Sequence, residues 1–298
     1  MSASPLHRRA HPVAIGVVLI YTAITLLPIL FMLLTSFKEP SATTKIPPGI
    51  LPIAPAPPGP PGPPGSAAPD YFFVPTLQNY RDQFSTPEVL GFVLNSTVVA
   101  IVTTLASVGL GTLAAYGFSR FKMAGSANWQ FFILSTRMLP AMAVSVPIAW
   151  MYQQLGLRDT WLGLIILYTC FNLSFSTWMM KAFIDEIPTA YEEAALLDGY
   201  TRMQVFRKII LPEASTGILA TAVFCLIAAW NEYAFAVTLT THKAQTLPVY
   251  IAAVAGAPQV PFGRLAAGAI LFVTPIVLFT LLMRKHLLRG ITFGAVKG

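Results

Sequence analysis

Long uncharged apolar runs constrain this chain more than any other feature. A helix needs about 20 apolar residues to cross the hydrocarbon core of a bilayer. Six stretches meet this requirement: 13–37, 89–119, 127–152, 160–180, 214–241 and 265–283. The third carries one charge, Arg137, and the fifth carries one, Glu232. Because these runs are far too long for barrel strands, we predict an all-α membrane protein with six transmembrane helices.

The composition agrees with a membrane location. Only 10% of the 298 residues are charged, against roughly 25% in an average soluble domain. Such a chain carries too little charge to cover the surface of a soluble protein. Cys170 and Cys225 both lie inside apolar runs, so they do not indicate a disulfide framework. Together these features exclude a secreted disulfide scaffold, a disordered tail protein and most cytosolic enzymes.

Positive charges in the loops predict the orientation. With a cytoplasmic N-terminus, the inside segments hold twelve Lys and Arg residues and the outside segments hold six. Both termini are therefore predicted to be cytoplasmic, as tails 1–12 and 284–298, and the fifth span is taken from Pro212 as 212–241. The first run could instead be a signal peptide. Its length and the lack of a small-x-small cleavage site favour an uncleaved anchor.

The first external loop, 38–88, contains a proline-rich insert. Ten of the 18 residues in 47–64 are proline, and Gly59, Gly62 and Gly65 follow at every third position. The collagen-like pattern is too short for a triple helix. We interpret the insert as an extended polyproline II spacer rather than a binding motif.

The cytoplasmic loop 181–211 predicts two short helices joined by a turn. Pro188 suits the start of a helix, Glu192 and Glu193 lie in its first half, and Gly199 ends it. A second, basic helix follows and leads to Pro212. The small-residue face of the first helix and the charges of the loop leave two interpretations open. The loop is either an ordinary interfacial amphipathic helix or a docking surface for a soluble partner.

The same loop resembles the EAA loop of ABC importer permeases. Glu193-Ala194-Ala195, three residues, Gly199, nine residues and then Ile209-x-Leu211-Pro212 match it in type and spacing. Three further segments are similar to the carbohydrate-importer branch, of the maltose, trehalose and polyol type: 135–140, 230–233 and 246–249. The end of the chain, 290–298, also resembles that branch. The proline-rich insert and Ser174 depart from the pattern.

The resemblance implies a type I ABC importer fold and the function of an inner-membrane permease subunit. It implies a homologous second permease, two ATPase subunits and an extracytoplasmic solute-binding protein as partners, in a bacterial cytoplasmic membrane. ATP and Mg²⁺ would be bound by the ATPase, and no cofactor by this chain. The residues implied in ATPase coupling are Glu192, Glu193, Ala194, Ala195, Gly199, Ile209, Leu211 and Pro212.

Other chemistry finds little support. The dipeptide Gly-Lys is absent, so the chain has no P-loop for ATP. The histidines lie outside the apolar runs and show no metal-binding or Ser/His/Asp spacing. No catalytic residue or metal ligand is therefore predicted. Ser107, Gly111 and Ala115 form a small-residue stripe that favours close helix packing.

Ionisable groups within spans are candidates for function. Arg137 lies ten residues into the third span and Glu232 twenty residues into the fifth, so in unbroken helices their depths differ by about 15 Å. For Arg137 we favour a buried helix-packing anchor bonded to carbonyl groups over contact with the solute. For Glu232 and Asn231 two interpretations stay open, the lining of a substrate cavity and structural packing. Tyr168 and Asn172 are weaker candidates for the cavity.

Three functions remain in competition. The first is the membrane subunit of an ATP-driven importer for a sugar, sugar alcohol or related polyhydroxy solute. The second is a secondary transporter driven by an ion gradient, which often shows internal repeats and paired intramembrane charges. The third is a structural or assembly protein of the membrane.

Overall fold

The computed structural model describes residues 12–39, 43, 50, 52, 73–257 and 260–293, with side chains as far as residue 283. Nearly all of the proline-rich insert and residues 294–298 lie outside this part. The longer helices are α1 (Pro12–Ser36), α4 (Pro87–Arg120), α5 (Ser126–Ser135), α6 (Ala141–Gln154), α7 (Trp161–Asp185), α11 (Ser215–Trp230), α13 (Leu247–Gly256) and α14 (Phe262–Phe293). The shorter ones are α3 (Gln78–Phe84), α8 (Thr189–Leu197), α9 (Arg202–Val205), α10 (Leu211–Glu213) and α12 (Ala234–Leu239).

Four of the described helices are long and apolar enough to cross a membrane: α1, α4, α7 and α14. The number rises to six if each of two bent helix pairs counts as one span.

The first bent pair corrects the predicted third span. The expected single helix 127–152 is two helices, α5 and α6, at 90° to each other. A 3₁₀ turn follows α5, and then Leu139 and Pro140 are extended. Proline disfavours helical geometry in the residue before it and has no N–H to donate, which accounts for a break at this point. The Thr136 hydroxyl lies 3.0 Å from the Ser174 hydroxyl, so the break is tied to α7.

The second bent pair corrects the predicted fifth span, 212–241. Residues 202–213 meet α11 at 74°, and α11 ends at Trp230. The Glu232 carboxylate accepts the backbone N–H groups of Phe235 (3.0 Å) and Ala236 (3.2 Å). It therefore satisfies unpaired donors at the start of α12 and starts a new short helix there.

The last helix is longer than predicted. The expected span was 265–283 with a tail beyond it, whereas α14 runs from Phe262 to Phe293 without interruption in the backbone. Pro275 lies inside it.

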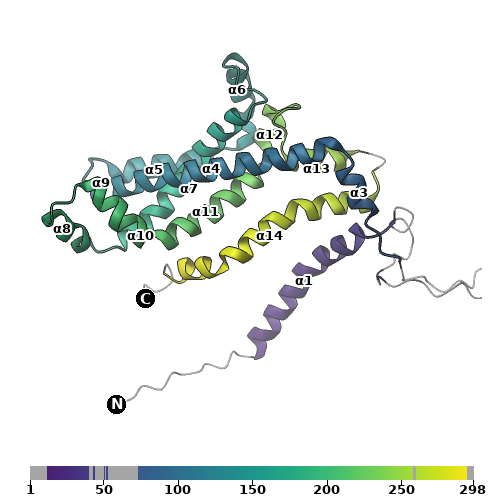
Figure 1. The fold of residues 1–298 in the computed structure, drawn as a ribbon, viewed down its shortest axis with the longest axis horizontal. Helices are drawn as coiled ribbons and strands as arrows, with labels where there is room; N and C mark the ends of the chain where they lie inside the picture. The colour runs from purple at the N-terminus through teal and green to yellow at the C-terminus, as the bar shows by residue number, and fades with distance from the viewer. Residues whose placement is uncertain are drawn as a thin grey trace, which may run out of the picture. The chain divides into compact units, whose positions relative to one another are not determined.

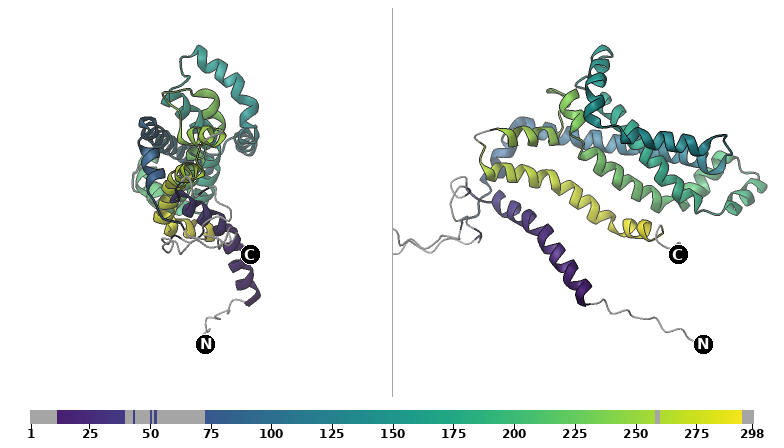
Figure 2. Two further views of the ribbon diagram at one scale, coloured as in Figure 1. Left: turned by 90° about the vertical axis from the view of Figure 1, so that its right-hand side faces the viewer. Right: turned by 180° about the vertical axis from the view of Figure 1, so that it is seen from behind.

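Helices α4, α7 and α11 pack side by side and form the core of the larger compact unit, which comprises 87–253 and 272–298 (Figures 1 and 2). Small residues allow the close approach. A Cβ added to Gly111 would lie 2.2 Å from the Ser176 hydroxyl oxygen, and one added to Gly217 would lie 2.4 Å from the Phe183 ring. Ser107 and Ala115, on the same stripe as Gly111, are fully buried.

The smaller unit comprises 1–86 and 254–271. Within it, α3 holds the end of α1. The Asn79 amide donates to the carbonyl oxygens of Ser36 (2.9 Å) and Lys38 (2.7 Å), and Tyr80 bonds the Ser36 hydroxyl. Lys38 is buried, with its amine over the Phe31 ring, and this burial lowers its pKa.

A polar network fixes the loop between α12 and α13. Asp159, at a left-handed φ of 56°, accepts the backbone N–H groups of residues 241 to 244 at 3.0 to 3.3 Å. The Asn95 amide of α4 donates to the carbonyl oxygens of Lys243 and Gln245. These hydrogen bonds to the charged form hold the pKa of Asp159 well below its ordinary value, although partial burial opposes them.

We expect the variant Asp159→Asn to lower the melting temperature of the detergent-solubilised protein by about 3 °C or more, because it removes a charged acceptor of several N–H groups. A carboxyl group whose pKa is lowered by folding contributes its full stabilisation above its ordinary pKa. That stabilisation is lost as the pH falls through the pKa of the folded protein. Because the ordinary pKa of Asp159, 3.8, and the lowered one both lie below pH 5, the loss of melting temperature should be equal at pH 8 and pH 5. A deficit at pH 5 that is half the one at pH 8 would contradict this assignment.

Candidate coupling site and solute pocket

The elbow, residues 186–213, begins with α8 at one end of the α4–α7 bundle (Figure 1). Gly199, at a φ of +86°, ends this helix. The Gly199 N–H donates to the Leu196 carbonyl (3.1 Å) and the Tyr200 N–H to the Ala195 carbonyl (3.0 Å). This pair of hydrogen bonds is the Schellman motif. The motif needs a residue in the left-handed conformation, which glycine adopts without strain.

The second arm of the elbow starts with a capping box. The Thr201 N–H donates to the Gln204 side chain (2.8 Å), and the Gln204 N–H donates to the Thr201 hydroxyl (3.3 Å). A π-helical turn, Phe206–Ile210, continues the arm into α10. Its Phe206 ring lies 5.0 Å from that of Tyr116 in α4. The arm therefore packs on a buried apolar cluster: Ala115, Tyr116, Met180, Ile184, Ile187, Phe206, Ile210 and Ala214.

The two adjacent glutamates of α8 point in different directions. Glu193 is exposed, whereas Glu192 is 5% exposed. The Glu192 carboxylate accepts a hydrogen bond from the Tyr116 hydroxyl (2.9 Å) and pairs with the Arg120 guanidinium. Glu192 therefore binds groups inside the protein, whereas Glu193 lies on the surface, and the predicted part of Glu192 in ATPase coupling stays a prediction.

The other predicted coupling residues divide between the surface and the interior. Ala194 is exposed next to Glu193, and Leu197 is 89% exposed, which is unusual for a leucine at the end of a helix. Ala195 is buried. In the second arm, Ile209 and Leu211 are half-buried, and Pro212 is exposed at the start of α10. The outward face of α8 thus combines a carboxylate, a small side chain and an unpartnered leucine.

A polar pocket of about 220 Å³ lies beside the break between α5 and α6 and beside the end of α11. Its lining includes Arg137, Tyr168, Asn172, Glu232 and, as apolar walls, Leu139, Ala141, Phe171, Ala228, Ala229 and Phe235. The predicted 15 Å difference in depth between Arg137 and Glu232 assumed unbroken helices, and this condition is not met, because the helix beside each residue is interrupted. The two charges line one pocket without forming an ion pair.

Each predicted cavity residue has a defined place. Tyr168 and Asn172 are buried and line the pocket. The Tyr168 hydroxyl has Glu232 as its electrostatic neighbour but forms no hydrogen bond of normal geometry. Asn231 is the exception. It is exposed, and its amide donates to the Ile227 carbonyl (2.7 Å) of its own helix rather than lining the pocket.

Arg137 does not fit the prediction of a buried anchor. It is exposed, and its guanidinium carbon lies 5.1 Å from the centre of the Phe175 ring. Arg137 lies in the 3₁₀ turn that follows α5 and lines the polar pocket.

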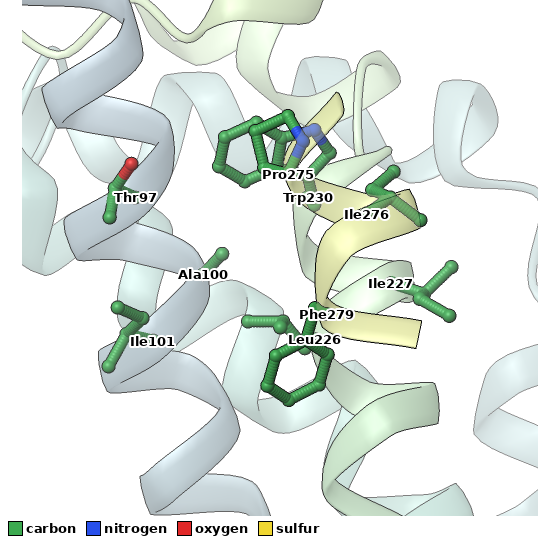
Figure 3. Close-up of a pocket in the computed structure, with 9 residues that line it drawn as sticks. All are labelled: Thr97, Ala100, Ile101, Leu226, Ile227, Trp230, Pro275, Ile276 and Phe279. Atoms are coloured by element: carbon green, nitrogen blue, oxygen red, sulfur yellow. The ribbon is translucent and has the colours of Figure 1, made fainter. Parts of the chain in front are cut away.

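A second pocket, of about 170 Å³, has a different character (Figure 3). Its lining comes from α4, α11 and α14: Thr97, Ala100, Ile101, Leu226, Ile227, Trp230, Pro275, Ile276 and Phe279. The indole N–H of Trp230 already donates to the Phe272 carbonyl (3.1 Å), and the Thr97 hydroxyl to the Val93 carbonyl (2.7 Å). This pocket therefore offers no free donor to a polyhydroxy solute.

Sequence reasoning missed three residues that organise these sites. Arg120 counted only as a positive loop charge, and Tyr116 only as part of an apolar span. Asp159 had no assigned role. Their partners in other segments lie 64 to 85 residues away in the chain, so local spacing carried no signal for them.

The family model for the inner membrane component of binding-protein-dependent transport systems matches residues 107–293. The chain therefore belongs to this family of ABC transporter permeases. Membership decides for binding-protein-dependent import and against a transporter driven by an ion gradient.

The similar proteins include permeases of two trehalose transport systems and one chain of a solved ABC transporter. The trehalose transport system permease protein of Mycobacterium tuberculosis is 38% identical over 75% of this chain and 82% of its own. The trehalose/maltose transport system permease protein of Thermococcus litoralis is 33% identical over the same shares. A bacterial ABC transporter for the acidic polysaccharide alginate has a chain of the same fold, with a TM-score of 0.71 and 19% identity over 96% of this chain and 99% of that one.

Proposed function

We propose that this chain is one of two permeases in an ATP-driven importer for a sugar, sugar alcohol or related polyhydroxy solute. The complex would contain a homologous second permease, two ATPase subunits that bind ATP and Mg²⁺, and an extracytoplasmic binding protein. This chain would cross the bacterial cytoplasmic membrane six times, with both termini and the elbow on the cytoplasmic side. The charge distribution of the loops supports that orientation.

The observation that carries the proposal is the outward face of α8. This face exposes Glu193, Ala194 and Leu197. The opposite side of the helix is attached to α4 through the ion pair of Glu192 with Arg120. An exposed apolar side chain beside a small residue and a charge suits a groove in a soluble partner better than it suits lipid headgroups.

The mechanism that follows is alternating access. ATP binding would close the two ATPase subunits and draw the elbows of the two permeases together. The packed helices α4, α7 and α11 would move with the elbow, opening the external side so that the binding protein releases its solute. Hydrolysis would then return the permeases to the inward-open state.

The polar pocket supports the solute class. It offers a carboxylate, a carboxamide, a guanidinium and an unbonded hydroxyl beside an aromatic ring, the groups that bind sugar hydroxyls and ring faces. The relatives named for trehalose and maltose transport point to the same class.

The test is reconstitution of both permeases with the ATPase subunits in proteoliposomes, with ATP inside and the cognate binding protein outside. We expect uptake and ATPase stimulation by one member of a panel of disaccharides, polyols and sugar phosphates. Uptake by this chain without the ATPase subunits, abolished by an ionophore, would reject the proposal.

The variant Tyr168→Phe tests the pocket. It removes only a hydroxyl that forms no hydrogen bond of normal geometry in the protein, so folding should be unaffected. We expect the transport KM to rise about tenfold, equivalent to 1.4 kcal/mol, with kcat within twofold. Thr97→Val, in the apolar pocket, is the matched control and should change neither value. An unchanged KM for Tyr168→Phe would place the solute path elsewhere.

A further inference from the structure

Arg120, the last residue of α4, connects three segments of the chain. Its guanidinium pairs with the Glu192 carboxylate of α8. It also donates to the carbonyl oxygens of Ile184 (2.9 Å) in α7 and Ile187 (2.8 Å) in the turn that follows. The side chains of Arg120 and Glu192 are only 8% and 6% exposed, respectively.

Neighbouring groups extend this connection. The Tyr116 hydroxyl, one turn earlier in α4, donates to the second oxygen of Glu192 (2.9 Å). The Ser119 hydroxyl accepts from Arg120 (2.9 Å) and bonds Asp185 at the end of α7. Both oxygens of the Glu192 carboxylate are therefore held by α4.

The attachment of α8 depends on very few side chains. Of the nine residues in the helix, only Glu192 and Ala195 are buried. Ala195 contributes a single methyl group and Leu196 is half-buried, so Glu192 supplies the polar side-chain contact that joins α8 to α4. A planar guanidinium that bonds several acceptors fixes orientation as well as distance.

We propose that Arg120 and Glu192 form a rigid joint that passes movement of α8 to α4 and α7. Both are positioning residues, distinct from the exposed Glu193 that would meet the ATPase. This inference rests on the proposed function of the elbow as the docking site. It assigns different roles to two adjacent glutamates. Glu193 binds the ATPase subunit, and Glu192 transmits the movement of that subunit to α4 and α7.

The first test compares Arg120→Gln and Glu192→Gln with the control Glu193→Gln in reconstituted complexes. We expect the two joint variants to retain bound ATPase subunits and ATP hydrolysis within about twofold, while solute imported per ATP falls at least fivefold. The double variant should be no worse than Arg120→Gln alone, because the two residues act as one unit. Glu193→Gln should instead reduce ATPase binding and leave solute per ATP unchanged.

The joint is overturned if solute imported per ATP stays within twofold of wild type in both variants, or if the two losses multiply in the double variant. Glu192→Gln is nearly isosteric and keeps the measurement available if Arg120→Gln does not reach the membrane.

The second test does not depend on solute. Spin labels are placed at Thr189 in α8 and at Leu105, an exposed residue of α4, in a complex with Cys170→Ser and Cys225→Ala. We expect a narrow distance distribution that is unchanged on adding ATP, and a broad one with Arg120→Gln. A narrow distribution with Arg120→Gln contradicts the joint. Absence of uptake by the wild-type complex, with this distance result intact, would reject the proposed function instead.

Discussion

Replacing Glu193 by lysine is expected to reduce ATP-driven uptake at least about tenfold and to release the ATPase subunits from the purified complex. The residue is exposed on α8, and the change reverses a charge at the centre of the proposed contact. Co-purification of the ATPase with this chain is the direct measurement. The quantity of this chain in the membrane should not change, because Glu193 makes no buried contact.

The matched control is Glu186→Lys. Glu186 is also exposed and lies just before the elbow helix, at the end of α7. It undergoes the same charge reversal and should retain both uptake and ATPase binding. A normal yield of complex with Glu193→Lys, or an equal loss with both variants, would remove α8 from the docking surface.

The variant Gly111→Val is expected to prevent stable folding. Its Cβ would lie 2.2 Å from the Ser176 hydroxyl oxygen and 3.1 Å from the Ser176 backbone, so α4 and α7 would have to separate. Overpacking of a close contact costs about 1–3 kcal/mol, and more where backbone must move. We expect a loss of most folded protein, measured as the monodisperse fraction after solubilisation in mild detergent.

Gly109→Val is a close control for this effect. Gly109 lies two residues away in the same helix, and a Cβ there would have open space around it. The substitution makes the same change in propensity and side-chain volume without the contact. Equal yields of the two variants would show that close packing of α4 on α7 is not required.

Apolar length predicts which segments of the chain can be buried in lipid, because that property depends on composition. It could not predict where helices break. Pro140 lies at the break between α5 and α6, yet Pro28, Pro147 and Pro275 lie inside continuous helices. A proline weakens a helix locally, and contacts with neighbouring segments decide whether the helix bends. At Pro140 these contacts include the hydrogen bond between the hydroxyl groups of Thr136 and Ser174.

The elbow was predictable in outline because its signals are local. Gly199 has a left-handed φ and ends α8. A glycine directly after a short helix predicts such an end. The direction of Glu192 was not predictable. Its partner Arg120 is 72 residues earlier, and both glutamates lie in the same helix turn. Which of the two is buried depends on how α8 docks against α4.

The most direct test of the account places a single cysteine at Leu197 or, as a control, at His242, in a chain without its native cysteines. Both positions are exposed, and α4 separates them: Arg120, at its end, holds α8, and Asn95, near its start, holds the loop of His242. We predict that a thiol-reactive cross-linker joins residue 197, and not residue 242, to an ATPase subunit in intact membranes. Cross-linking of the ATPase through residue 242, with none through residue 197, would contradict the account.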